Sequence, residues 1–402
     1  MGVGPSSHRR RLLVLGAGPA QLGLLRAAHE RGVFVIACDR DPLAPGFEYA
    51  DRRAVVSIED EPAIGQLADA ERVEGLVSPG ADWPVAIAAR VAARLNLQHP
   101  VSPETASVAV SKTRQREVFA AHGVPQPRWT MDPGTASDVG FPCVVKASDL
   151  QGQRGLSLVH EPAELDAAVE LALAESRSGT LLIEELVEGP ELTVNAFSIS
   201  GEMFPLTITD RLTADLPAFG VALAHAWPSA VPSGLGPVFE AARAAASAVG
   251  VTDGPTYTQV RIGPDGPKVM ELAARLGGGH DAELCAAALG VDLNGLAIGA
   301  ALGEPVEPPL PQGRGGACVR FFVAPEGELS NVEGLEEAQA HEGVIEAQVY
   351  RRPGWRFGPL RRGADRAGFV LARGKSRDDA LERAGRAMDC VRFVTADVEA
   401  RV

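Results

Sequence analysis

The 402-residue chain has little cysteine and no closely spaced cysteine pair. Its cysteines are scattered and form no CxxC motif: Cys38, Cys143, Cys285, Cys318 and Cys390. This spacing argues against a zinc site or a disulfide framework and favours a reducing compartment. Basic residues are also in deficit, with 38 Lys and Arg against 52 Asp and Glu, a net charge of −14. The chain therefore lacks the basic footprint of a nucleic-acid-binding protein.

Long hydrophobic runs are missing as well. The basic opening MGVGPSSHRRR is followed by LLVLGAGPA, which is too short and too broken by glycine for a signal peptide or a membrane span. We therefore expect a cytoplasmic protein without a membrane partner. There is no internal repeat and no low-complexity tract. The length predicts two or three compact units, and a hydrophobic content of 46% is enough to build their cores.

The first 40 residues predict a βαβ unit with an incomplete glycine fingerprint. An apolar run, Arg11–Leu15, ends in Gly16-Ala17-Gly18, and an amphipathic helix over 20–31 and a buried strand over 33–38 follow. The third glycine of a GxGxxG motif is replaced by Gln21. A nicotinamide oxidoreductase is thus an alternative with weak support, which saturable NAD(P)H binding would favour.

Further along, the pattern changes several times. Residues 97–111 carry two prolines and predict a connection, and a helix over 112–122 follows, with Ser111 placed to cap it. Residues 304–316 are rich in proline and glycine and predict a linker. The tail predicts short strands with one helix over 376–388.

Residues 256–281, TYTQVRIGPDGPKVMELAARLGGGHD, predict a β-hairpin whose second strand carries side chains suited to a binding site. Because side chains alternate along strands, Gln259 and Glu271 should lie opposite each other on one face. Arg275 follows Glu271 by four residues and precedes three glycines. Two oxygen ligands, a fixed cation and a glycine loop are what a Mg²⁺–nucleotide site requires. An ordinary hairpin with solvated charges is an equally open interpretation.

A second chemical signal is Lys146, at the end of a predicted strand over 142–146 and before the loop KASDLQGQRGL. Backbone N–H groups of such a glycine-containing loop can surround phosphates while the lysine supplies charge. It is not a Walker A motif, and a surface loop with a solvated lysine remains open. Lys112 lies at a helix N-terminus, where the helix dipole disfavours a cation, which is a small reason to expect an anionic partner.

A third signal follows the hydrophobic strand that ends in Glu184-Glu185-Leu186-Val187. Backbone N–H and C=O groups at the end of a strand can form hydrogen bonds with the edge of an adenine ring. Glu191 could accept hydrogen bonds from two ribose hydroxyls. The alternative is a solvated acidic turn, which is the commoner fate of a charge run.

In their order along the chain, these motifs resemble the ATP-grasp superfamily over residues 108–302. The region before them resembles the pre-ATP-grasp domain of carboxylate–amine ligases. Gly152-Gln153-Arg154-Gly155 and the segment PLTITDRLT (205–213) are most similar to the L-amino acid ligase and carbamoyl-phosphate-synthetase-like branch. The resemblance implies an α/β (α+β ATP-grasp) fold. Its expected parts are a βαβ pre-ATP-grasp domain (9–107), a two-lobed ATP-grasp module (108–305) with a mobile lid lobe (about 125–187), and a small α+β C-terminal domain (315–402).

The resemblance also implies roles for residues around ATP. Lys112 and Lys146 would contact the α- and β-phosphates, and Glu191 would bind ribose. Residues 151–155 would form a lid over the phosphates. Adenine would be read by Glu184 with the backbone of two neighbours. The lid and adenine positions carried over are Gly152, Arg154, Gly155, Glu185 and Val187.

For the reaction itself, the resemblance implies that Gln259 and Glu271 hold Mg²⁺, with Mn²⁺ as an alternative ion. Arg275 would stabilise the transferring phosphoryl group, and Arg211 occupies a position that is often basic near the γ-phosphate. The family often has a carboxylate at the position of Gln259, and Ala273 stands where it has an asparagine ligand. One or two ions are therefore both open.

Substrate contacts are assigned to Gly277, Gly278, Gly279 and His280. For the glycines a tight turn is an equal alternative, and for a lone histidine a packing or capping role is the commoner one.

The implied function is that of an ADP-forming ligase that activates a carboxylate, of an amino acid or related acid, as an acyl phosphate and couples it to an amine. One alternative is a purine-pathway or carboxylase-type enzyme with a phosphorylated or bicarbonate substrate, and another is a non-catalytic nucleotide-binding protein. The resemblance allows a homodimer. The C-terminal pairs Arg351-Arg352 and Arg361-Arg362 are interpreted as solvated surface rather than anion sites.

Overall fold

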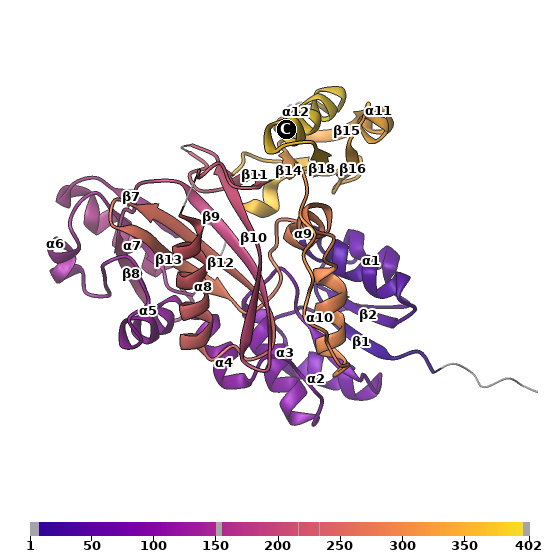
Figure 1. Cartoon of the computed structure of the whole chain (residues 1–402), viewed down its shortest axis with the longest axis horizontal. Helices are drawn as coiled ribbons and strands as arrows, with labels where there is room; N and C mark the ends of the chain where they lie inside the picture. The colour runs from indigo at the N-terminus through magenta and orange to yellow at the C-terminus, as the bar shows by residue number, and fades with distance from the viewer. Residues whose placement is uncertain (1–7, 150–154, 216, 233, 397–402) are drawn as a thin grey trace, which may run out of the picture.

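The N-terminal part of the chain forms a parallel sheet, as the βαβ pattern predicts. In the computed structural model, which describes residues 8–149, 155–215, 217–232 and 234–396, this sheet has the order β3-β2-β1-β4. Figure 1 labels two of its strands, β1 and β2. Its strands are β1 (Arg11–Leu15), β2 (Phe34–Asp39), β3 (Arg52–Val55) and β4 (Gly75–Val77). The helices in this part are α1 (Leu22–Glu30), α2 (Glu61–Ala70) and α3 (Trp83–Arg94). The side chain of Gln21 packs against Gly16 and Gly18, so it fills the space above the glycine turn where a dinucleotide would approach.

The segment expected as a plain connection contains a helix, α4 (Pro103–Ala109), so that prediction is wrong. Ser102 caps it by accepting a hydrogen bond from the backbone N–H of Thr105. Pro103 occupies the first helical position, where the missing N–H costs nothing, so the proline starts this helix rather than preventing it. The next helix, α5 (Lys112–Ala121), is confirmed with its predicted cap, since the Ser111 hydroxyl accepts from the N–H of Arg114.

A small antiparallel sheet with the order β5-β8-β6-β7 stands apart from the rest in Figure 1. It consists of β5 (Trp129–Thr130), β6 (Cys143–Ala147), β7 (Leu156–Val159) and β8 (Leu181–Glu185), with the helices α6 (Ala136–Val139) and α7 (Leu165–Glu175). Its core is a separate cluster that includes Val145, Ala172 and Ile183.

The largest sheet has eight strands in the order β13-β12-β9-β10-β11-β14-β18-β16. These are β9 (Glu191–Ile199), β10 (Glu202–Thr213), β11 (Ala222–Trp227), β12 (Gly254–Gly263), β13 (Gly266–Ala273), β14 (Gly316–Phe322), β16 (Val344–Val349) and β18 (Gly368–Gly374). The helix α8 (Leu235–Val249) packs against β13 and its neighbours. The predicted hairpin is β12–β13, and its register places Gln259 opposite Glu271 as predicted.

The helical region after the hairpin is divided at Gly290, as its sequence suggests, into α9 (Asp281–Leu289) and α10 (Leu293–Ala301). Both helices join the core of the N-terminal sheet, and α10 packs against α1 and β4. The helices α9 and α10 therefore join the large sheet to the N-terminal sheet, although they follow the N-terminal sheet by about 200 residues in the sequence. None of the helices in the described ranges is long and apolar enough to cross a membrane.

The large sheet continues beyond the expected linker, because β14 pairs with β11. The tail adds a three-stranded sheet, β17-β15-β19, made of β15 (Gly327–Glu333), β17 (Arg356–Phe357) and β19 (Arg392–Ala396). It contains α12 (Arg377–Cys390) where one helix was predicted, and also α11 (Leu335–Ala340), which was missed. With six residues, α11 is too short for its periodicity to be recognised.

Candidate active site

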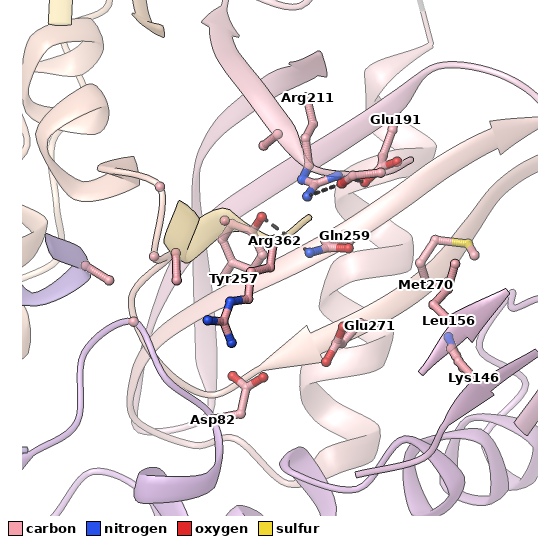
Figure 2. A pocket seen from close by; sticks show the side chains of 18 of the residues that line it. Asp82, Lys146, Leu156, Glu191, Arg211, Tyr257, Gln259, Met270, Glu271 and Arg362 are labelled. Atoms are coloured by element: carbon pink, nitrogen blue, oxygen red, sulfur yellow. Dashed lines mark hydrogen bonds and ion pairs between the residues drawn. The ribbon is translucent and has the colours of Figure 1, made fainter. Parts of the chain in front are cut away.

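A cavity of about 630 Å³ opens where these parts of the chain meet. Its walls come from the N-terminal loops, the small β5–β8 sheet, the large sheet and the loops after β16 and before β18. This volume falls within the range typical of small-molecule sites, about 300–1,000 Å³. Figure 2 shows the side chains of its lining, with Lys146 and Leu156 at one end and Arg362 toward the other.

The floor of the cavity is one face of β9 to β13. Across these strands, Arg211 lies opposite His225, Gln259 lies opposite Glu271, and Arg261 lies opposite Glu191. Because alternate residues share a face, the pairing register alone gathers these polar side chains on one surface. In Figure 2 the amide of Gln259 lies between the Glu191–Arg211 pair and Glu271.

Glu271 and Gln259 supply oxygen atoms at the centre of this floor. Lys112 donates from Nζ to Oε1 of Glu271 at 2.9 Å, and both residues line the cavity. Burial disfavours the charge on Lys112, but the carboxylate of Glu271 outweighs it and raises the pKa of the lysine. Among the described residues, no cluster of three or more His, Cys, Asp or Glu side chains could hold a metal ion.

A buried triad stands beside this pair. Glu184, whose side chain is 1% exposed, accepts from Nε of Arg116 and from Nζ of Lys146, both at 2.6 Å. Burial alone would raise the pKa of Glu184, but the two cations lower it to about 2. For Lys146, burial lowers the pKa, and the neighbouring cations Arg116 and Lys112 lower it further. The carboxylate that the sequence assigned to adenine is therefore engaged in holding Lys146 in place.

Arg275 is fixed by a residue from the N-terminal part of the chain. Its Nε lies 2.5 Å from Oδ1 of Asp82, and its guanidinium lies over the ring of Tyr257 at 5.5 Å. Asp82 is 6% exposed and lines the cavity. Burial raises the pKa of Asp82, and the nearby carboxylate of Glu271 acts in the same direction.

Glu191 uses both of its oxygens within the protein. Oε1 accepts from Arg211 at 2.6 Å, and Oε2 accepts from Arg261 at 2.6 Å. Burial opposes its charge, but the two arginines lower its pKa. A ribose at this position would have to share these oxygens with two guanidinium groups, so ribose binding by Glu191 stays a prediction.

One wall of the cavity is apolar and includes a backbone N–H group without a hydrogen bond to another described residue. Leu156, Val187 and Met270 line it, together with Glu185. No hydrogen bond between described residues uses the backbone N–H of Val187, whereas its carbonyl accepts from Arg261. A flat apolar slot with an available N–H fits an adenine ring, as predicted for this strand end.

The predicted lid residues are largely outside this description. Gly152 and Arg154 lie outside the described residues. Gly155 is described, with a φ of +63°, and a Cβ built on it would lie 3.0 Å from the Cβ of Glu175. It therefore packs against α7.

The three glycines before α9 are placed in a crowded turn. A Cβ on Gly277 would lie 2.1 Å from the carboxylate of Asp281, and one on Gly279 would lie 2.7 Å from Nε2 of His225. Gly278 and Gly279 line the cavity, so the loop is both a tight turn and part of its wall.

His280 is 6% exposed and is not among the residues that line this cavity. It stacks on Phe369 at 3.6 Å, and its Nε2 lies 2.6 Å from the hydroxyl of Tyr350. This is the packing role that the sequence left open for a lone histidine.

The sequence missed a group of arginines that the tail brings to the cavity. Arg351 and Arg362 line it, although the arginine pairs were interpreted as solvated surface; Arg351 is half-buried, whereas Arg362 is exposed as expected. Arg366 lines it too, with its guanidinium 3.6 Å from the ring centre of Phe321. No ion pair between described residues involves Arg351 or Arg366. Their only sequence signal was the density of arginine in this loop.

Two family models match the chain. An ATP-grasp domain matches residues 139–283, and the L-amino acid ligase C-terminal domain 2 matches residues 320–396. The formate-dependent phosphoribosylglycinamide formyltransferase of Burkholderia thailandensis is 30% identical, with 98% of each chain covered.

Solved structures share the fold. The L-amino acid ligase from Bacillus licheniformis has a TM-score of 0.82 at 20% identity, covering 98% of this chain and 100% of the other. The biotin carboxylase domain of a 2-oxoglutarate carboxylase from Hydrogenobacter thermophilus, a complex with MgADP and bicarbonate, has a TM-score of 0.81 at 18% identity. It covers 96% of this chain and 90% of that chain.

Proposed function

The chain belongs to the ATP-grasp family of ligases, and from this premise we propose that it activates a carboxylate as an acyl phosphate and couples it to an amine, releasing ADP and phosphate. The observation that carries the proposal is the convergence of Lys112, Lys146 and Arg275 on one cavity with two oxygen ligands. These groups come from three separate parts of the chain, and ordinary packing gives no reason for them to meet.

The cavity suits ATP with Mg²⁺. Gln259 and Glu271 offer one amide and one carboxylate oxygen, a set that fits an ion sharing its other positions with phosphates and water. When bound, the ion would neutralise charge on the phosphates. The apolar wall with the N–H of Val187 would take the adenine, and the three cations would lie along the phosphates.

The charges of the chain account for the activation step. A carboxylate approaching ATP is an anion that meets a polyanion, so the step needs fixed positive charge at the transferring phosphoryl group. Asp82 and Tyr257 hold the guanidinium of Arg275, and Glu184 holds Lys146, so these donors are oriented before the substrate arrives. The acyl phosphate would be shielded from water by the small β5–β8 sheet, which we propose moves as a lid with residues 125–187.

A second candidate is an enzyme of the purine-pathway or carboxylase type, with a phosphorylated or bicarbonate substrate. Arg351 and Arg366 favour it, because both line the cavity and neither forms an ion pair with another described residue. The names of the formyltransferase and biotin carboxylase relatives agree with such substrates. In either case the substrates would be small molecules.

A coupled assay of ADP release separates these functions. The enzyme would be incubated with MgATP and a panel of amino acids and other acids, each with and without amines, and with bicarbonate alone. Acid- and amine-dependent ADP release supports the ligase, and bicarbonate-dependent release without an amine supports the carboxylase type. Release of AMP and pyrophosphate refutes both. If the wild type turns over no more ATP than the background and Glu271→Ala leaves that level unchanged, the result favours a non-catalytic nucleotide-binding protein.

A further inference from the structure

A histidine and an aspartate are buried together beside the cavity with atoms that lack partners. In the described chain, neither Nδ1 of His225 nor Oδ1 of Asp281 has a hydrogen-bond partner, and these two atoms are 4.0 Å apart. Their side chains are 2% and 1% exposed. Nearly all buried polar atoms in proteins are hydrogen-bonded, so a facing pair without partners calls for a functional explanation.

The surroundings of this pair are polar rather than apolar. His225 lies on β11 opposite Arg211, on the face that forms the cavity floor, and Asp281 begins α9, which packs against β10. Four more buried atoms on the same face of β9 and β10 lack a partner among the described residues: Oγ1 of Thr193, Oδ1 of Asn195, Oγ1 of Thr209 and Nε of Arg211. A region with several such atoms is where ordered water is expected, which can carry protons.

The other ring nitrogen of His225 reaches toward the reaction site. His225 lines the cavity, and its Nε2 is so close to Gly279 that a Cβ there would lie 2.7 Å from it. Gly278 and Gly279 also line the cavity, near the end where Arg275 is held. The imidazole therefore lies between the substrate loop on its Nε2 side and a buried carboxylate on its Nδ1 side.

Electrostatics keep this histidine neutral. Burial lowers its pKa to about 4, an effect opposed by Asp281 and Glu191 and reinforced by Arg211 and Arg366. The ring of Phe321, which is uncharged, packs edge-to-face with the imidazole. Near neutral pH the ring thus has one nitrogen available to accept a proton, and the carboxylate behind it can stabilise the resulting cation.

We propose that His225 accepts the proton that the amine substrate loses as it attacks the acyl phosphate, and that Asp281 stabilises the imidazolium. This role rests on the ligase function proposed above. The amine nitrogen forms a bond to the acyl carbon while the bond from that carbon to the phosphate oxygen breaks. The nitrogen's proton passes to Nε2 of His225, and inorganic phosphate leaves with the bonding electron pair. The imidazolium then returns its proton to solvent through the buried water.

The test compares two acceptors in the full-length enzyme. Wild type is first given MgATP, the acid panel and hydroxylamine, and hydroxamate is measured as a trap for acyl phosphate. The acid that gives the most hydroxamate is then used with a primary amine from the same panel. His225→Gln and Asp281→Asn are compared with wild type in both assays, from about pH 7 to about pH 9.5, which spans the range where alkyl amines begin to lose their proton. Hydroxylamine also loses a proton when it is acylated, but it is a strong nucleophile that is unprotonated at neutral pH, so water can take that proton and the reaction depends little on a base of the enzyme.

For His225→Gln we expect hydroxamate formation within about 3-fold of wild type and amide formation reduced about 100-fold or more at pH 7, the size of a general-base effect. The amide rate of the variant should recover as pH rises. Asp281→Asn should show the same split with a smaller loss. Equal losses in both assays would mean a structural role, and no loss would mean no role; either result overturns the proposal. If wild type forms no hydroxamate with any acid, the ligase function itself fails and this role fails with it.

Discussion

Replacing Glu184 with glutamine tests whether the buried triad is a structural support for the site. The carboxylate accepts from Arg116 and Lys146 at 2.6 Å each, and its side chain is 1% exposed. Glutamine has nearly the same shape, but it cannot neutralise either cation. Arg116, 1% exposed, would then be a buried charge without a counterion.

Two independent routes give the magnitude. The folded chain lowers the pKa of Glu184 from 4.5 to about 2. At about 1.36 kcal/mol per pH unit, this difference corresponds to about 3 kcal/mol of stability. Removing one partner of a buried ion pair costs about 3–5 kcal/mol in other proteins. We therefore expect Glu184→Gln to lower the free energy of unfolding by about 3 kcal/mol at pH 7.

The sign of the pH dependence follows from the direction of the shift. Because the folded pKa is lower than the unfolded one, the contribution is complete above pH 4.5 and is lost as pH falls toward 2. Between pH 6 and pH 4, the advantage of wild type over the variant should shrink by about 1 kcal/mol.

Urea unfolding, followed by fluorescence at several pH values, measures both effects. Glu333→Gln is the control, since Glu333 is 46% exposed and its partner Arg392 is 72% exposed; it should cost at most about 1 kcal/mol. If the two variants unfold alike at pH 7, or if the difference for Glu184→Gln does not change with pH, the reasoning about this triad is wrong.

Three further predictions concern the site and its frame. Glu271→Gln should lower ATP turnover about 100-fold or more by removing the one carboxylate facing Gln259, while the exposed change Glu333→Gln should not; steady-state ADP release checks this. Gly279→Ala should reduce turnover about 10-fold or more with the fold intact by circular dichroism, because its Cβ would displace His225; unchanged activity would contradict the contact. Arg377→Met should cost about 1–3 kcal/mol, since it leaves the nearly buried Asp210 unpaired, whereas Arg386→Met on the same helix should cost under about 0.5 kcal/mol in thermal or urea unfolding.

Local patterns predicted the parts of the site that depend on neighbours in sequence. Alternation and a tight turn are enough to place Gln259 opposite Glu271, and the register confirms it. The cap of α5 by Ser111 depends on three residues and is equally readable. The same local reasoning failed at Pro103, because proline is common both in loops and at the first position of a helix. In this chain Pro103 begins α4.

The partners of the charged groups were not predictable in this way. Asp82 meets Arg275 across 193 residues, and Lys112 meets Glu271 across 159. A single sequence carries no record of such distances, so a cation in it can equally be solvated, paired or bound to a ligand. The arginines of the tail were misjudged for this reason.

The sequence by itself determined the chemical inventory: a hairpin with two oxygen ligands, lysines at a helix start and a strand end, and a glycine turn before α9. These depend on periods of two and 3.6 residues and on turn chemistry, which act within a few residues. Only the tertiary structure decided that Glu184 supports Lys146, that Asp82 holds Arg275, and that His225 and Asp281 share a buried space beside the cavity. Those outcomes depend on which charges become buried together, because burial makes an unpaired charge costly and a paired one fixed, and burial is a property of the packed chain.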